Sequence, residues 1–113
     1  MTPEGKIVQY IIKKSKEAGG TTRKLSYEGR IGAPDRLVLL PGIAFFIEAK
    51  RPEGGILSPA QKREIGILIK SGLMVFVCDT SEKVDKAFEM ASEVQAMRGL
   101  RRPEKLKNFQ KKP

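Results

Sequence analysis

Two short apolar segments joined by Pro41-Gly42 constrain the fold of this chain more than any other feature. The segments are residues 36–40 (RLVLL) and residues 43–50 (IAFFIEAK), and both are too short for typical helices. A proline-glycine pair between them is typical of a tight turn, so the sequence predicts an antiparallel β-hairpin. Because both segments are apolar almost throughout, we expect burial on both faces, as in a sheet covered by helices.

Three other segments have the pattern of helices that flank such a sheet. The first begins at Thr2-Pro3-Glu4, with a hydroxyl cap, a proline and an acid, and it ends at Gly19-Gly20. The second begins at Ser58-Pro59 and ends near Ser71-Gly72, and the third begins at Thr80 or Ser81. Their expected apolar faces are, in chain order, Ile7, Val8, Ile11 and Ile12; Ile65, Leu68 and Ile69; and Val84, Phe88 and Ala91.

Two further segments are expected to complete the sheet. Residues 21–27 (TTRKLSY) are rich in β-branched and aromatic residues, and residues 73–78 (LMVFVC) are apolar, so both predict strands. Because a helix separates residues 73–78 from the hairpin, that strand should pair in parallel through a right-handed crossover. The predicted order is α-β-β-β-α-β-α, which is an α/β fold with a mixed sheet flanked by helices.

Length and charge indicate one domain followed by a basic tail. A chain of 113 residues without an internal repeat suits a single domain, expected over residues 1–97. Residues 98–113 contain seven basic residues and one acid, so they carry +6 of the total formal charge of +9. We expect this tail to be flexible, and its charge suits a polyanion such as nucleic acid. A solvated tail that only aids solubility is an equally good interpretation.

The composition excludes several classes of chemistry. The chain has no histidine, which removes Ser-His-Asp and Cys-His catalysis, His-ligated zinc and nucleases with a histidine general base. The single cysteine, Cys78, cannot form an internal disulfide and is expected to be a buried, inert thiol. The sequence also lacks a long apolar segment or a signal peptide, so we expect a soluble, intracellular protein. Catalysis must therefore depend on carboxylates, lysine, hydroxyls and a bound metal.

Asp35, Glu48 and Lys50 are the best candidates for such chemistry. Residues i and i+2 of a strand share a face, so Glu48 and Lys50 project together while Ala49 points away. The hairpin places Asp35, just before its first strand, across from them. Two carboxylates suit Mg²⁺, and the backbone carbonyl of Ala49 can add a ligand. Such a metal would polarise a phosphodiester, while Lys50 could orient water or stabilise developing charge.

A structural interpretation of these residues competes with the catalytic one. Lys50 could simply neutralise two acids across the hairpin, and on the spacing alone this ion pair is the better interpretation. However, two acids close to the apolar run AFFI would repel each other unless a cation lay between them. In addition, Gly29 and Gly32 flank a loop whose backbone could approach a phosphate closely.

The sequence resembles the PD-(D/E)XK nuclease superfamily, in particular the stand-alone, virus-type VRR-NUC domain found in phages and in larger repair nucleases. The resemblance extends from Glu4 to about Phe88. It depends on four stretches in this order and spacing, namely GRIGAPD at 29–35, FIEAK at 46–50, GGILSPAQ at 54–61 and GLMVFV at 72–77.

This resemblance implies a restriction-endonuclease-like core and phosphodiester hydrolysis with Mg²⁺ or Mn²⁺. By position, Asp35 and Glu48 match metal ligands and Lys50 matches the catalytic lysine. Glu4 matches an acid that can complete the metal site through water, although a first-turn acid is also favoured by the helix dipole. Gln61 matches a glutamine that positions the attacking water or the lysine, and an exposed helical glutamine is the alternative.

The resemblance also implies branched DNA as the substrate and a homodimer as the active form. A symmetric dimer with one site per strand matches the pseudo-symmetry of a four-way (Holliday) junction. In a phage protein, the expected location is the cytoplasm of a bacterial host. The basic tail lies beyond the matched region, so the resemblance gives it no role, and from its charge we expect an accessory DNA-binding arm. Candidate phosphate contacts, each also interpretable as an ordinary surface charge, are Arg23, Lys24, Arg30, Arg51, Lys62 and Arg63.

Three other functions remain open from the sequence. Within the same enzyme class, the chain could be a flap-directed, end-directed or unselective nuclease, because branch selectivity depends on dimer geometry rather than on a motif. From a different class, it could be a DNA-binding module without catalysis, although such a module would not need all of Asp35, Glu48 and Lys50. An interaction domain with a fortuitous E-x-K pattern is the third alternative.

Overall fold

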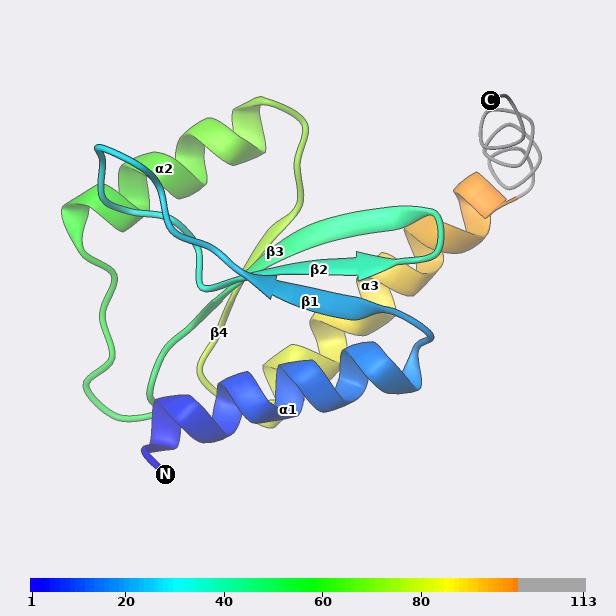
Figure 1. Ribbon diagram of the computed structural model, residues 1–113, viewed down its shortest axis with the longest axis horizontal. Coiled ribbons are helices and arrows are strands. Elements are labelled where there is room, and N and C mark those ends of the chain that lie inside the picture. Colours follow the sequence, from blue (N-terminus) through cyan, green and yellow to red (C-terminus); the bar gives the residue numbers. More distant parts are fainter. Residues whose placement is uncertain (100–113) are drawn as a thin grey trace.

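The structure is a computed structural model and describes residues 1–99 of the chain. Figure 1 shows a single sheet flanked by three helices, in the predicted order α-β-β-β-α-β-α. The elements are α1 (Pro3–Glu17), β1 (Thr21–Lys24), β2 (Arg36–Leu40), β3 (Ile43–Ala49), α2 (Pro59–Lys70), β4 (Val75–Cys78) and α3 (Ser81–Gly99).

The sheet is mixed, as the sequence predicts. Its strand order is β1-β2-β3-β4, with antiparallel pairs between β1 and β2 and between β2 and β3, and a parallel pair between β3 and β4. Leu40 pairs with Ile43, so Pro41 and Gly42 form the hairpin turn, and Gly42 has a φ of 80° that suits glycine. The hairpin and the parallel crossover are both confirmed.

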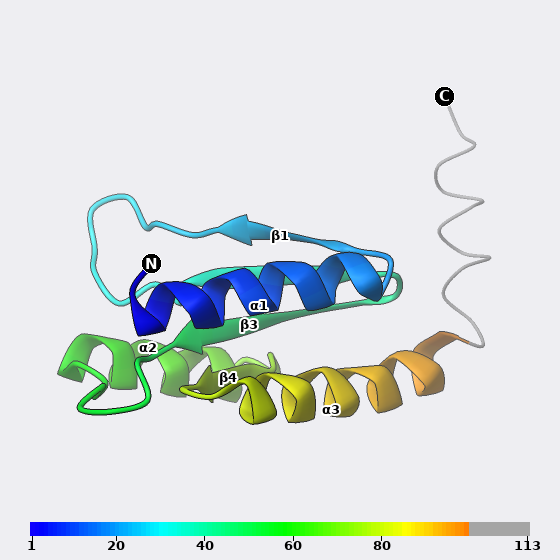
Figure 2. The same cartoon turned by 90° about the horizontal axis from the view of Figure 1, so that it is seen from below.

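The hydrophobic core lies between α1, α3 and one face of the sheet, an arrangement that Figure 2 shows from below. Phe45 on β3 is at its centre, with edge-to-face contacts to Phe76 at 5.6 Å and to Phe88 at 5.4 Å between ring centroids. The expected faces of the first and third helices are buried here, since Ile11, Val84 and Ala91 are fully enclosed. Cys78 is buried as predicted, and burial raises the pKa of its thiol to about 11, which disfavours the reactive thiolate.

The expectation that both faces of the hairpin are buried is wrong. On the face opposite the core, Ala44 is exposed and Phe46 is only half-buried. The predicted inner face of α2 is only partly right. Ile65 and Leu68 are half-buried, but Ile69 is 53% exposed, and the buried residues of this helix are Ala60 and Glu64. The reason is that α2 contacts the sheet mainly at its edge strand β4 and does not cover the second face.

Several element boundaries also differ from the sequence prediction. The first strand was expected to extend to Tyr27, but β1 ends at Lys24, because the backbone N–H of Leu25 donates to the Asp35 carbonyl at 3.2 Å and closes a loop over residues 25–35. Strand β3 ends at Ala49, one residue before the predicted end at Lys50, and β4 begins at Val75, two residues after the predicted start at Leu73. The Thr80 hydroxyl accepts from the Lys83 N–H at 3.2 Å and therefore caps α3.

The basic tail lies mostly outside the described residues. Helix α3 includes Arg98 and Gly99, whereas the expected flexibility of the tail and its expected role as a DNA-binding arm concern residues that, from 100 on, lie outside the described part. Within residues 1–99, no helix has the length and apolar character that crossing a membrane requires.

Candidate active site

The end of the hairpin brings Asp35, Glu48 and Lys50 together. Arg36 pairs with Ile47, so the residues directly beyond this pair, Asp35 and Glu48, lie at the same end of β2 and β3. The Asp35 carboxylate accepts a 2.7 Å hydrogen bond from the Ala49 N–H through Oδ2, which fixes its orientation. The Ala49 side chain is buried, while Lys50 Nζ lies 3.9 Å from Glu48 Oε1.

Glu48 is an unusual carboxylate because it is almost completely buried. The residue is 2% exposed, and its Oε2 atom has no hydrogen-bond partner among the described residues. Burial, together with the nearby Asp35 carboxyl, raises the pKa of Glu48 to about 8, while the positive charge of Lys50 opposes this shift. A buried carboxylate oxygen without a partner, beside a second carboxylate, fits a site for a divalent cation with oxygen ligands.

Gln61 connects helix α2 to both of these side chains. Its Nε2 donates to Glu48 Oε1 at 3.0 Å, and its Oε1 accepts from Lys50 Nζ at 2.9 Å. The same Oε1 accepts from the Ser58 N–H at 2.8 Å, while the Ser58 hydroxyl accepts from the Gln61 N–H at 3.1 Å. This capping box fixes both the start of α2 and the orientation of the amide. Gln61 is therefore not the exposed helical glutamine of the alternative interpretation.

Glu4 lies close to this group but outside a compact cluster. It is exposed in the first turn of α1, and its negative charge helps to raise the pKa of Glu48. Among residues 1–99, no group of three or more acids, cysteines or histidines is close enough to hold a metal ion directly. Glu4 and Lys50 do line the same hollow of about 510 Å³, together with Arg51 and Ile56.

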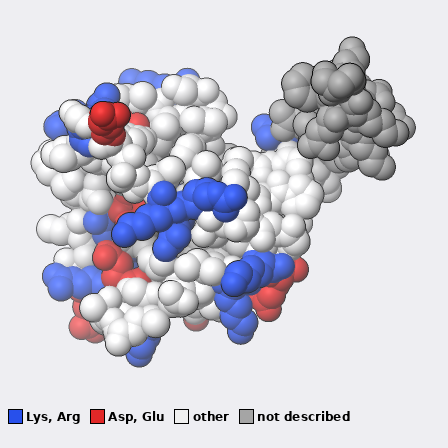
Figure 3. Space-filling model, viewed as in Figure 1, with Lys and Arg blue, Asp and Glu red and all other residues white. Residues whose placement is uncertain are grey.

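The six candidate phosphate contacts are distributed over several elements. Arg23 and Lys24 are exposed on β1, where Figure 3 shows Lys and Arg side chains gathered beside a smaller group of acids. Lys24 also lines a hollow of about 250 Å³, which Asp35, the residue before β2, lines as well. Arg30 lies in the loop over residues 25–35, Arg51 lies beyond β3, and Lys62 and Arg63 are exposed on α2.

Sequence reasoning missed the buried acid Glu64, one turn after Gln61 on α2. The Tyr27 hydroxyl donates to Glu64 Oε2 at 2.7 Å, and Arg30 Nη2 lies 3.6 Å from Glu64 Oε1. Burial and this hydrogen bond raise the pKa of Tyr27 to about 12, so the phenol stays a donor. Glu64 thereby attaches the loop over residues 25–35 to α2.

Gly32 makes a close contact with the start of α2. It has a φ of +103°, and a Cβ atom here would lie 2.8 Å from the Ala60 carbonyl oxygen. A side chain at this position would therefore push the loop away from α2. The absence of a side chain serves a contact within the protein.

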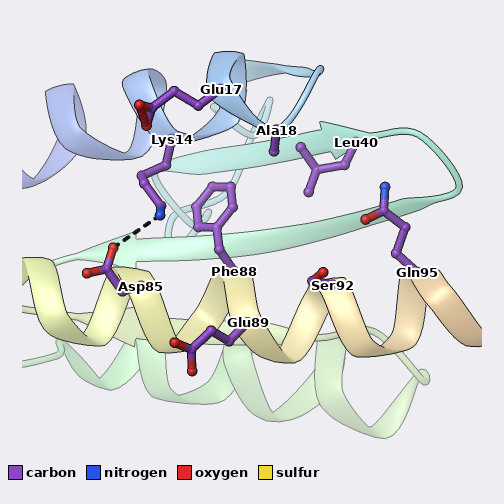
Figure 4. A pocket seen from close by; sticks show the side chains of 9 residues that line it. All are labelled: Lys14, Glu17, Ala18, Leu40, Asp85, Phe88, Glu89, Ser92 and Gln95. Carbon is purple, nitrogen blue, oxygen red and sulfur yellow. Dashed lines mark ion pairs between the residues drawn. The ribbon is translucent and has the colours of Figure 1, made fainter.

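A third hollow, of about 460 Å³, lies between α1 and α3 at the β2 end of the core (Figure 4). Asp85 on α3 accepts a 2.7 Å hydrogen bond from the Tyr10 hydroxyl and pairs with Lys14 at 3.4 Å. These bonds lower the pKa of Asp85 and join α1 to α3. Because these polar groups already bind one another, we interpret them as contacts that hold the two helices together rather than as a binding site.

A curated protein and a solved structure are similar to this chain in sequence. No protein-family model matches the chain. The curated protein "Putative nuclease p44" from Acyrthosiphon pisum secondary endosymbiont phage 1 is 38% identical over 80 residues, which is 70% of this chain and 85% of the relative. A solved structure titled "VRR_NUC domain" is 44% identical with a TM-score of 0.74, and the match covers 79% of this chain and 97% of that chain. The similarity therefore covers nearly the whole of both relatives.

Proposed function

Because this chain belongs to the VRR-NUC domain family of nucleases, we propose that it is a metal-dependent endonuclease that cleaves four-way DNA junctions as a homodimer. The observation that supports metal dependence is Glu48, whose buried Oε2 atom lacks a partner beside the Asp35 carboxylate. A divalent cation would satisfy that oxygen and offset the repulsion between the two acids.

In this proposal, Asp35, Glu48 and the Ala49 carbonyl hold Mg²⁺ or Mn²⁺, and Glu4 completes the site through water. When bound, the metal polarises the phosphodiester and lowers the pKa of coordinated water. Lys50 stabilises the negative charge that develops on the phosphate, because its ammonium group is held at the same site. Gln61 supports this role through its 2.9 Å hydrogen bond with Lys50 and its 3.0 Å hydrogen bond with Glu48.

DNA binding is assigned to the basic side chains around this site. Phosphate contacts supply most of the non-specific affinity for DNA, and they require exposed Lys and Arg side chains. Arg23, Lys24, Lys62 and Arg63 meet this requirement on two elements, β1 and α2. We assign Arg51 to the same role because it lines the hollow that Lys50 and Glu4 share.

The homodimer is supported by apolar side chains that the chain leaves exposed. Ile69 on α2, Leu73 after it and Val77 on the edge strand β4 are exposed on neighbouring elements. An exposed apolar group along a sheet edge favours association, and a two-fold axis would pair this surface with its copy. A second copy of the chain is therefore the proposed occupant of this surface.

Replacement of Leu73 with glutamate is expected to convert the dimer to a monomer, because it would bury a charge in the interface. Light scattering coupled to size-exclusion chromatography measures this change. Met97→Glu is the control, since Met97 is 79% exposed on α3, away from this surface. Paired cuts in a four-way junction should be lost with the dimer. A monomeric wild-type protein that still makes paired cuts would contradict this part of the proposal.

The decisive experiment compares labelled four-way junction, flap and linear duplex DNA with Mg²⁺, with Mn²⁺ and with EDTA. We expect symmetric cuts in the junction that require a metal. Preferential cutting of flaps or ends would establish the alternative nuclease specificity. Cutting that persists in EDTA would contradict the proposed metal site, and binding without any cutting would indicate a non-catalytic DNA-binding module.

Gln61→Ala is expected to slow cleavage by about 10- to 100-fold, as is typical when a partner of a catalytic group is removed. The matched control is Ser58→Ala, which removes the hydroxyl from the capping box but leaves the bonds from Gln61 to Glu48 and Lys50. Cleavage rates and thermal unfolding should be measured for both variants. Equal losses of activity in the two would mean that Gln61 acts only through the stability of α2.

A further inference from the structure

The loop over residues 25–35 presents an exposed isoleucine beside the candidate active site. Ile31 is 78% exposed, and it lies between Arg30 and Gly32. Single exposed apolar residues are common on protein surfaces and usually need no explanation. Ile31 differs because the loop that carries it is attached to the catalytic end of the molecule at several points.

Three contacts attach this loop. The N–H of Leu25 and the carbonyl of Asp35 close its base at 3.2 Å, and the Tyr27 hydroxyl binds the buried Glu64 at 2.7 Å. The backbone of Gly32 packs directly against Ala60 at the start of α2. A side chain next to Gly32 therefore has a defined position relative to α2.

That position is close to the groups assigned to catalysis. Ala60 precedes Gln61, which binds Glu48 and Lys50, and the loop ends at Asp35 itself. Figures 1 and 2 show the loop at the end of the molecule where α2 begins. A DNA strand that reaches Asp35 and Glu48 would pass close to residues 30–32.

The neighbouring Arg30 provides a contact for such a strand. Glu64 lies 3.6 Å from one guanidinium nitrogen, while the Arg30 side chain is 61% exposed. The guanidinium therefore keeps free donors in a restricted orientation, which suits a phosphate oxygen. The loop thus combines a phosphate-binding group with an adjacent apolar side chain.

We propose that Ile31 is a wedge that inserts between unstacked bases beside the cleaved phosphodiester, with Arg30 bound to an adjacent phosphate. Insertion of an apolar side chain between bases costs stacking energy, and this cost is lowest where the stack is already broken. Ile31 would therefore favour branch points over continuous duplex. This inference rests on the proposed nuclease function and identifies a residue that determines its substrate preference.

Glu64 and Tyr27 act as positioning residues in this proposal. They do not contact DNA themselves, and they act by holding the loop that carries Arg30 and Ile31. Tyr27→Phe keeps the ring but removes the donor to Glu64, so it should weaken the effect of Ile31 without removing it.

The test uses a four-way junction with 2-aminopurine next to the branch, because the fluorescence of this base rises when it unstacks. In a Lys50→Ala background that binds without cutting, we expect binding to raise the fluorescence. Ile31→Ser should abolish the rise, Ile31→Leu should restore it, and Tyr27→Phe should reduce it. Met97→Ser is the matched control, since Met97 is 79% exposed on α3.

Cleavage by the otherwise wild-type protein gives a second readout. Ile31→Ser should lower the rate at the junction about tenfold relative to linear duplex, in line with the energy of a single base contact. Hydrolysis of the small diester bis(4-nitrophenyl) phosphate, which has no stacked bases, should not change. Thermal unfolding checks that the variants fold.

The outcomes separate the wedge from the nuclease function. A fluorescence rise that persists in Ile31→Ser, or equal losses of activity on junction and duplex, would overturn the wedge and leave the nuclease proposal intact. If the wild-type protein hydrolyses neither DNA nor the diester, the proposed function fails. The fluorescence measurement on bound DNA still decides whether Ile31 unstacks bases.

Discussion

Replacement of Lys50 with alanine is expected to lower the rate of DNA cleavage by about 100- to 1000-fold, the usual effect of removing one group that stabilises transition-state charge. The Lys50 side chain is 15% exposed, and its ammonium group lies 3.9 Å from Glu48 and 2.9 Å from Gln61. It is therefore held at the site where charge would develop on the phosphate.

The rate of cleavage of bound junction in excess enzyme measures this effect separately from binding. Lys50→Met removes the charge but keeps most of the length of the side chain, so it should be as slow as Lys50→Ala. Lys86→Ala is the control, because Lys86 is an exposed lysine on α3. Affinity for junction DNA should change little in the Lys50 variants. A cleavage rate within a few-fold of wild type would show that Lys50 only neutralises Glu48.

The three residues of this site could be predicted to meet because their arrangement depends on local rules. Side chains alternate along a strand, so Glu48 and Lys50 share a face, and the turn at Pro41-Gly42 fixes the register that brings Asp35 to them. The hydrogen bonds of Gln61 to Glu48 and Lys50 could not be predicted from these local rules, because they join α2 to the hairpin. The spacing of Ser58 and Gln61 is that of a capping box, and this signal could have indicated that the amide is oriented.

The position of Glu64 could not be predicted from periodicity. The apolar pattern of α2 favours Ile65, Leu68 and Ile69 as its inner face, yet Glu64 is buried and Ile69 is exposed. Two non-local facts reverse the pattern. Helix α2 meets the sheet mainly at its edge strand β4. Tyr27, 37 residues earlier in the chain, supplies the hydrogen bond that makes burial of a carboxylate tolerable.

The exposed apolar residues of α2 and β4 could not be predicted from periodicity either. A sequence pattern identifies residues that avoid water, but it does not identify which surface covers them. In this chain the pattern predicted a covered sheet, whereas the described residues leave Leu73 and Val77 exposed. The pattern is consistent with a partner surface, which is why the oligomeric state is a central test.

Glu48→Gln is expected to stabilise the metal-free protein while abolishing its stabilisation by Mg²⁺. The substitution keeps an oxygen that can accept from Gln61 Nε2 and removes a charge that is buried beside Asp35. Folding raises the pKa of Glu48 from 4.5 to about 8. A raised carboxyl pKa means that its contribution to stability is fully present below pH 4.5 and is lost as the pH rises towards 8.

Thermal unfolding in EDTA should therefore show the largest advantage of Glu48→Gln above pH 8, and this advantage should shrink as the pH falls towards 4.5. Mg²⁺ should raise the melting temperature of the wild-type protein by mass action and leave that of the variant unchanged. Glu89→Gln is the control, because Glu89 is an exposed acid on α3. If Mg²⁺ stabilised both proteins equally, the cation would bind elsewhere, and the oxygen of Glu48 that lacks a partner would need another explanation.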